Sequence, residues 1–367
     1  MPLVAHSNLP AFDDLKREGE TVIPGELAIH QDIRELHIGL LNLMPDAALT
    51  ATERQFLRLI NDSNQIAQFY VHLFTLPELE RSPDGLAHVA AHYETFEQIQ
   101  ASGLDALIVT GANVTQPDLS KEAFWEPLIE VVDWAYANVT STLFSCLTTH
   151  ATLQFRFGQK RRRLPAKRWG VFPHRLTERH HPLVVGVNTR FDVPHSRFNE
   201  IGRDQFEAAG LRVLVESDEA GVHLAVSQDG FRLVFFQGHP EYDTISLLKE
   251  YKREVMLFAA GAREDYPPFP ENYFAPLCRA ILDEYADLVI AAKQDNTPIP
   301  RFPEALIVPK LDNTWHDTAE AILNNWVGKV YQTTNQDRTK LFMEGINPDD
   351  PLGIYGTSSV SPVLPLP

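Results

Sequence analysis

Short apolar runs recur through the first half of the chain, and each ends in small or polar residues that lead into a segment with helical spacing of apolar side chains. The runs cover residues 36–43, 69–74, 104–110 and 141–145. Strands that are apolar throughout are typical of parallel sheets, because crossover helices cover such sheets. The pattern therefore predicts an α/β fold with a mostly parallel sheet, and a helix at about 147–157 after the fourth run.

The second half of the chain has a more broken pattern. Prolines interrupt residues 160–194, which we expect to form shorter strands and surface loops. Apolar runs return at 211–215, 223–227 and 231–236, and a helix at about 245–260 follows the last of them. Gly261 is a suitable stop for that helix.

These patterns divide the chain into four parts. Residues 1–34 form an N-terminal extension, and residues 35–265 form the expected catalytic domain. A prolyl linker then leads into a C-terminal helical segment, residues 266–346, whose apolar spacing predicts a packed helix at 314–331. Residues 347–367 are rich in Pro, Gly and Ser, and we expect this tail to be poorly ordered.

Charge and composition exclude several classes of protein. The 32 basic residues against 49 acidic ones give a net charge of -17, which argues against a general nucleic-acid binder. No apolar stretch reaches the ~20 residues of a membrane span, and the first residues do not resemble a signal peptide. Two cysteines cannot build a disulfide framework, so we expect a cytoplasmic protein with a thiol free for chemistry.

Candidate chemistry gathers at the ends of the predicted strands, where ligands bind in open parallel sheets. Cys146 stands where a strand turns into a helix, so backbone N–H groups and the helix dipole would lower its thiol pKa and offer an oxyanion hole. His239, at another strand end, could act as the general base, and Glu241 could orient its ring. A lone cysteine is also common as buried filler. His150, one helical turn after Cys146, is a second candidate base, although core packing explains it as well.

Signals for bound groups are missing from the sequence. There is no Gly-rich phosphate loop or dinucleotide fingerprint, so we expect no nucleotide cofactor. No histidine or cysteine group stands at metal-ligand spacing, so we also expect no metal. The second cysteine, Cys278, lies in an apparent helix and is expected to serve packing.

Five short motifs then resemble one known family, the homoserine O-succinyl/acetyltransferases, whose fold is related to the flavodoxin-like class I glutamine amidotransferases. In order, they are LNLMP at 41–45, VTGA at 109–112, STLFSC at 141–146, PHSR at 194–197 and GHPEYD at 238–243. The resemblance covers about residues 35–335. It implies helices on both faces of the sheet, a homodimer, and acyl transfer from acyl-CoA to L-homoserine in methionine biosynthesis. In that reaction acyl-CoA is a substrate, so no cofactor is implied.

The resemblance also implies roles for individual residues. Cys146 would be the acylated nucleophile, His239 the proton acceptor and Glu241 its partner. Lys167 and Ser196 fall at substrate-contacting positions. Arg253 matches the arginine that would hold the amino acid's carboxylate, a task suited to a bidentate guanidinium. The basic stretch at 160–168 could attract the phosphates of CoA or could be a solvated loop.

Two positions depart from the family's pattern. Asp46 follows the first motif where the family commonly has lysine, so a contact of that lysine is in doubt. Thr115 stands where glutamate accompanies acetyl-CoA and glycine accompanies succinyl-CoA in the family. A glutamate would repel the succinyl carboxylate, whereas threonine is neutral and could donate a hydrogen bond, so we expect succinyl-CoA as donor.

Other functions stay open at this stage. The donor could be acetyl-CoA, and the acceptor could be L-serine, since one methylene gives only ~1–3 kcal/mol of discrimination. A glutamine amidotransferase would use a similar Cys, His and Glu set, although its nucleophile normally stands between glycines. A degenerate binding protein on the same fold is a further alternative, which the complete set of candidate residues disfavours.

Overall fold

One large sheet forms the centre of the molecule. The computed structural model describes residues 3–30, 33–64 and 66–355. These residues form an 11-stranded sheet in the order β2-β1-β4-β3-β5-β6-β11-β10-β9-β7-β8. The strands are β1 (Leu3–Ala5), β2 (Val22–Pro24), β3 (Glu35–Leu41), β4 (Gln68–Phe74), β5 (Ala106–Val109), β6 (Ser141–Ser145), β7 (Arg162–Leu176), β8 (Arg190–Glu200), β9 (Arg212–Ser217), β10 (Gly221–Val226) and β11 (Leu233–Phe236).

The first seven strands of this order are parallel. Neighbours from β2 to β11 pair in parallel, and β6 lies between β5 and β11. The predicted strand at 141–145 and helix at 147–157 coincide with β6 and α7 (Leu147–Phe157). The prediction of an α/β fold on a mostly parallel sheet is therefore confirmed, and the carboxyl ends of β5, β6 and β11 meet at one edge.

The remaining strands are antiparallel. β9, β10 and β11 pair antiparallel in sequence order, and β9 also pairs with β7, which makes a long hairpin with β8. The prediction of short strands and loops in 160–194 is therefore wrong. The prolines are tolerated because β8 is an edge strand, and because β7 pairs with β9 only at Arg175 and Leu176, beyond Pro173.

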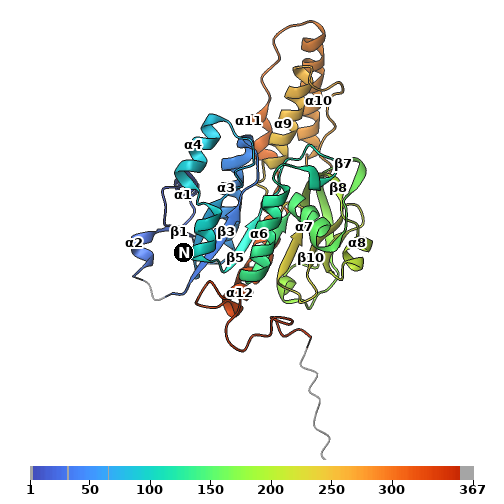
Figure 1. Cartoon of the computed structure of the whole chain (residues 1–367). Helices are drawn as coiled ribbons and strands as arrows, with labels where there is room; N and C mark the ends of the chain where they lie inside the picture. Colours follow the sequence, from blue (N-terminus) through green and yellow to red (C-terminus); the bar gives the residue numbers. More distant parts are fainter. Residues whose placement is uncertain (1–2, 31–32, 65, 356–367) are drawn as a thin grey trace, which may run out of the picture.

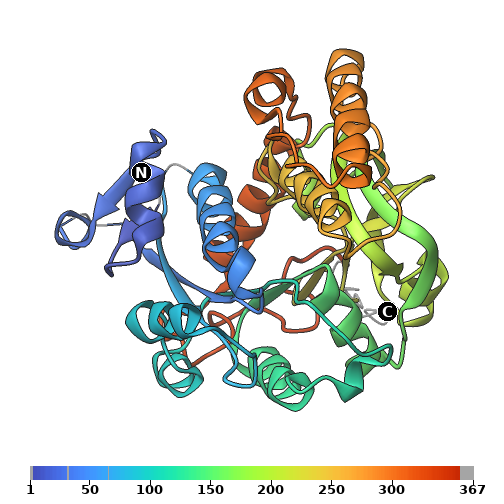
Figure 2. The same ribbon diagram turned by 90° about the horizontal axis from the view of Figure 1, so that it is seen from above.

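Helices cover both faces of the sheet (Figures 1 and 2). One face packs against α1 (Pro10–Arg17), α3 (Leu49–Ser63) and α12 (His316–Thr333). The other face packs against α5 (Phe96–Ser102), α6 (Trp125–Asn138), α7 and α8 (Arg203–Ala208). Strand β5 shows the alternation, because Ala106 and Ile108 join the first core whereas Leu107 and Val109 join the second.

A third core lies beside the hairpin. It packs α9 (Ser246–Ala259), α10 (Pro276–Gln294) and α11 (Glu304–Ile307) against β7, and these helices project at the top of Figure 1. Two further helices, α2 (Gly25–Ala28) and α4 (Pro83–His92), lie near the β1 side of the sheet.

The expected subdivision of the chain stays a prediction, but the structure shows where each part lies. The N-terminal extension adds β1 and β2 to the sheet, so it shares the main core. The expected helix at 314–331 corresponds to α12. Residues 347–355 form turns, and Tyr355 donates a hydrogen bond to the Gln228 carbonyl. The rest of the expected tail, 356–367, lies outside the described residues.

Candidate active site

Cys146 occupies a sharp turn between β6 and α7. Its backbone has φ 53° and ψ -105°, a conformation that L-residues rarely adopt. The turn is held by the Cys146 N–H, which donates to the Phe236 carbonyl on β11 at 2.8 Å. No side chain of the described residues caps α7, so the N–H groups of its first turn are available to an anion beside the thiol. A strained residue at a helix N-terminus is a frequent site for a nucleophile.

His239 and Glu241 lie on the connection that follows β11. The Nδ1–H of His239 donates to Glu241 Oε1 at 2.8 Å, and both side chains are buried. The other ring nitrogen, Nε2, makes no hydrogen bond to a nitrogen or oxygen atom of the described residues. Burial lowers the pKa of His239, but the charges of Glu241 and Cys146 outweigh it and raise the pKa well above its ordinary value. The structure thus brings the three predicted catalytic residues together.

Gly238 explains why a glycine precedes His239. A Cβ at this position would lie 2.5 Å from Val193 Cγ1, 2.8 Å from His223 Nδ1 and 2.9 Å from His195 Cε1. Only a residue without a side chain allows the chain to pass this close. The backbone just before His239 therefore packs directly against two buried histidines, His195 and His223.

These histidines belong to a buried cluster of three, His174, His195 and His223. The His174 and His195 rings stack with centroids 5.1 Å apart, and their Nε2 atoms are 3.2 Å apart. The Gly238 N–H donates to His223 Nδ1 at 3.3 Å. Burial lowers the pKa of His174 to about 4 and holds those of the other two well below the ordinary value, with a further contribution from the nearby Arg197 charge. All three rings are neutral at pH 7.

Lys167 and Ser196 meet at a buried carboxylate that the sequence did not single out, Glu250 on α9. Lys167 Nζ lies 3.0 Å from Glu250 Oε2, and the Ser196 hydroxyl donates to the same oxygen at 2.6 Å. Tyr242 donates to Glu250 Oε1 at 2.8 Å and stacks on the His239 ring with centroids 4.3 Å apart. Burial opposes ionisation of Glu250, but Lys167 and these hydrogen bonds lower its pKa. The two predicted substrate-contacting residues are thus linked to His239 through Tyr242.

Arg253 and Thr115 lie in more open positions. Arg253 is one helical turn beyond Glu250 on α9, its side chain is 63% exposed, and it lies 3.6 Å from Glu254. Thr115 is exposed on the loop after β5, where its N–H donates to Glu122 Oε1 at 2.7 Å. No contact in the described structure joins either residue to Cys146, so their predicted roles stay predictions.

Two arginines near Cys146 escaped the sequence reasoning. Arg161 is half-buried, donates to the carbonyls of Gln116 at 2.9 Å and Pro117 at 3.3 Å, and interacts electrostatically with Cys146. Arg197 is buried, donates to the Asn199 carbonyl at 3.1 Å, and also interacts with the Cys146 charge. Arg161 lies in the basic stretch and Arg197 in the PHSR motif, but only the fold shows that both lie near Cys146.

The remaining candidates have structural explanations. His150 is fully buried, contacts Gln237 Oε1 at 2.9 Å, and burial lowers its pKa to about 3. Cys278 is fully buried, and burial raises its pKa. Asp46 binds Arg81 at 3.1 Å and the Ser82 N–H at 2.6 Å, so it fixes the start of α4.

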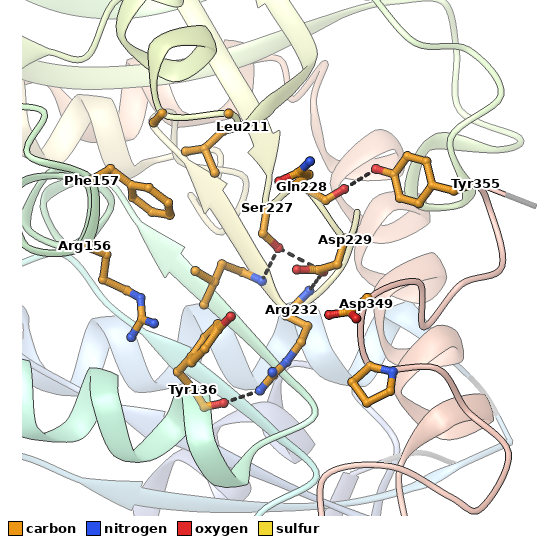
Figure 3. A pocket seen from close by; sticks show the side chains of 14 residues that line it. Tyr136, Arg156, Phe157, Leu211, Ser227, Gln228, Asp229, Arg232, Asp349 and Tyr355 are labelled. Atoms are coloured by element: carbon orange, nitrogen blue, oxygen red, sulfur yellow. Dashed lines mark hydrogen bonds between the residues drawn. The ribbon is translucent and has the colours of Figure 1, made fainter.

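Two cavities of the described residues lie at the two ends of β11, and one group of side chains resembles a metal-ligand cluster. A cavity of about 470 Å³ lies beside the catalytic connection and is lined by Glu241, Tyr242 and Asp243 together with α3. A larger cavity of about 600 Å³ lies at the opposite end of β11, between Arg156, Arg232 and Tyr355 (Figure 3). Asp62, His316 and Glu320 have potential metal-ligating atoms within 4.8 Å of one another, but His316 already pairs with Glu320 at 2.5 Å.

Comparison with known proteins identifies the family. Residues 2–336 match the family model described as homoserine O-succinyltransferase. The chain belongs to the homoserine O-succinyltransferase family. Relatives of that name include the protein of Nitrosococcus oceani, 70% identical over 96% of this chain and 99% of its own, and that of Allochromatium vinosum, 68% identical over the same shares. The protein of Cardiobacterium hominis is 51% identical over 96% of this chain and 99% of its own length.

Solved structures similar to this family member are more distant. They include a glutamine amidotransferase from Thermotoga maritima, with a TM-score of 0.43 and 9% identity over 82% of this chain and all of that one. Another, from Methylobacillus flagellatus, has a TM-score of 0.40 and 13% identity over 81% of this chain and 95% of that one.

The family match confirms the predicted membership and the expectation of a homoserine acyltransferase with a succinyl donor. It does not favour the alternatives of acetyl-CoA, L-serine or glutamine as substrates. No helix among the described residues is long and apolar enough to span a membrane.

Proposed function

We propose that the protein transfers the succinyl group of succinyl-CoA to the hydroxyl of L-homoserine through an acyl-cysteine, as one step of methionine biosynthesis. The observation that carries the mechanism is the arrangement of Cys146 on a strained turn with His239 and Glu241 next to it. Family membership supplies the substrates, since relatives at 70% and 68% identity bear the name homoserine O-succinyltransferase.

The first half-reaction forms the acyl-enzyme. The Cys146 thiolate attacks the thioester carbonyl carbon, and the free N–H groups at the start of α7 stabilise the oxyanion. The tetrahedral intermediate then expels the CoA sulfur. His239, protonated because Glu241 and Cys146 raise its pKa, gives its proton to that leaving thiolate. CoA-SH departs, and succinyl-Cys146 and a neutral imidazole remain.

The second half-reaction transfers the acyl group. Neutral His239 accepts the proton of the homoserine hydroxyl as the oxygen attacks the succinyl-Cys146 carbonyl. Collapse of the intermediate breaks the carbon–sulfur bond and releases O-succinylhomoserine. The thiolate and imidazolium are thereby restored, and Glu241 stabilises the positive ring through its 2.8 Å hydrogen bond.

Residues around this centre would bind the substrates. Lys167 and Ser196, both held by Glu250, would contact the acceptor, and the exposed Arg253 would hold its carboxylate. Thr115 would permit the succinyl carboxylate, because its hydroxyl is neutral and can donate. The chemistry needs no cofactor, since the thiol, imidazole and carboxylate supply every group that the two steps use.

The cellular setting is part of the proposal. Cys146 and Cys278 are both free thiols, which suits a reducing cytoplasm. Family resemblance also implies that the enzyme works as a homodimer.

Half-reaction measurements test this function. Purified protein with succinyl-CoA alone should release one equivalent of CoA and gain a succinyl group on Cys146, detected by intact-protein mass. Addition of L-homoserine should then discharge it, and Cys146→Ala should show neither event. Acetyl-CoA and L-serine, offered in the same assay, should be poorer substrates. Turnover by Cys146→Ala, or glutaminase activity without CoA release, would contradict the proposal.

A further inference from the structure

We propose that Glu18, Arg54 and Arg58 position the catalytic loop, residues 239–243, through Asp243, which makes the N-terminal segment a part of the catalytic apparatus. The three are positioning residues, since none contacts the reacting atoms. This inference rests on the proposed function, because its consequence is the alignment of His239 with Cys146.

The loop depends on tertiary contacts for its shape. His239 and Glu241 stand between the end of β11 and the start of α9, outside regular structure. On one side Tyr242 fixes the loop, because its ring stacks on His239 and its carbonyl accepts a hydrogen bond from Trp315 Nε1 at 2.9 Å. That contact leaves the far end of the loop, at Asp243, to be held by other residues.

Asp243 is held by two arginines of α3. Arg54 Nη2 donates to Asp243 Oδ2 at 3.1 Å, and Arg58 Nη1 donates to Oδ1, so both carboxylate oxygens are bound. The Asp243 side chain is 14% exposed, and those of Arg54 and Arg58 are 23% and 21% exposed. Charged hydrogen bonds shielded in this way are stronger and more directional than surface ion pairs.

Glu18 holds the arginines from the other side. It follows α1, which packs against α3. Arg58 Nη2 donates to Glu18 Oε2, and Arg54 Nε lies 3.7 Å from Glu18 Oε1. The two guanidinium groups thus stand between two carboxylates in a neutral cluster. Without Glu18, one arginine would be free to leave Asp243.

The cavity beside the loop makes this restraint necessary. Its volume of about 470 Å³ is bounded by Glu18, Arg54 and Arg58 on one side and by residues 240–245 on the other. A loop next to an open space can move into it when its anchor is removed. A misplacement of about 1 Å between catalytic groups is enough to reduce a rate on the order of 100-fold.

Kinetics of full-length variants test whether Glu18, Arg58 and Asp243 position the catalytic loop. Asp243→Asn and Arg58→Ala should lower kcat about 10- to 100-fold with little change in the KM for homoserine, because the His239–Glu241 geometry is lost. Glu18→Gln should lower kcat about threefold, as expected for a more exposed partner. Arg58→Lys should recover part of the loss of Arg58→Ala. The matched control is Asp14→Asn, which removes a carboxylate of α1 whose partner is the exposed Arg17.

The pH profile of CoA release separates positioning from a general loss of structure. Glu241 raises the pKa of His239, so a loop that no longer holds Glu241 should move the alkaline limb of the profile to lower pH. A variant that is only partly unfolded would release CoA more slowly by the same factor at every pH, and its alkaline limb would stay at the same pH. Unchanged kcat and pH profile in folded Asp243→Asn would overturn the inference. If that variant does not fold, unchanged values in Arg58→Ala and Glu18→Gln overturn it instead.

The same experiment keeps the two proposals distinct. Failure of the wild-type protein to form succinyl-Cys146 would remove the proposed function. If the wild-type protein forms succinyl-Cys146 and the variants react at the same rate, only the positioning role of Glu18, Arg54 and Arg58 is refuted.

Discussion

Replacement of His174 by asparagine should weaken the dependence of stability on pH. The His174 ring is buried, its Nδ1 contacts the Phe172 carbonyl at 2.8 Å, and burial lowers its pKa from 6.5 to about 4. In the unfolded chain the ring takes up a proton as the pH falls below 6.5, whereas the folded protein keeps it neutral. A lowered histidine pKa therefore favours unfolding in acid, and the cost is absent above the unfolded value.

The magnitude follows from this difference in pKa. When the pH falls from 7.5 to 5.5, a histidine that is protonated only in the unfolded chain lowers the free energy of unfolding by about 1.3 kcal/mol. His195 and His223, whose pKa values burial also lowers, add to this cost in the same direction. His239 acts in the opposite direction, because its raised pKa adds stability as the pH falls. A single substitution isolates one contribution from these opposing ones.

Urea unfolding at the two pH values, followed by circular dichroism, measures the effect. His174→Asn should lose stability at both pH values, but its loss between pH 7.5 and pH 5.5 should be about 1.3 kcal/mol smaller than that of the wild type. The exposed His180→Asn serves as the control and should leave the difference unchanged. Equal pH dependence in wild type and His174→Asn would refute the neutral, buried state assigned to this ring.

Three other predictions concern the catalytic site. Glu241→Gln should lower kcat on the order of 10²- to 10⁴-fold, because the His239 imidazolium loses its charged partner. Pre-steady-state CoA release measures this loss. A rate within twofold of wild type would contradict the role of Glu241. Gly238→Ala should destabilise the protein by about 1–3 kcal/mol, because the added Cβ would overlap with Val193, His223 and His195. Thermal unfolding measures this loss of stability. An unchanged midpoint would show that the loop can shift to make room. Thr115→Glu should reduce kcat/KM for succinyl-CoA at least tenfold more than kcat/KM for acetyl-CoA, because the glutamate would repel the free carboxylate of the succinyl group. An equal loss for both donors would show that Thr115 does not select the donor.

The sequence was most informative where local patterns and chemistry coincide. The apolar run at 141–145 and the helix at about 147–157 were predicted with the bounds of β6 and α7, because a buried strand that runs into a helix is marked by a short local pattern. The spacing of His239 and Glu241 places both on one loop, so their contact follows from two residues of separation. The order of the motifs then allowed the family to be recognised.

Long-range polar contacts could not be predicted in this way. Arg58 and Asp243 are 185 positions apart, and nothing in the local pattern around either residue marks its partner. Glu250 was missed for the same reason, since its partners Lys167 and Ser196 come from other elements. The β7–β8 hairpin was missed because its prolines argue against strands, and only the sheet order shows that Pro194 lies on the edge strand.

The order of the strands also constrains when the enzyme can become active during synthesis. β6 carries Cys146 but gains its second neighbour only when β11 has been made, at residues 233–236. Its buried face is closed later still by α12, where Trp326 donates to the Ser141 hydroxyl at 2.8 Å. Arg34, near the start, donates to the Thr334 carbonyl at 2.8 Å. Synthesis must therefore pass residue 334 before the nucleophile acquires these surroundings, and until then the apolar strands lack the segments that bury them.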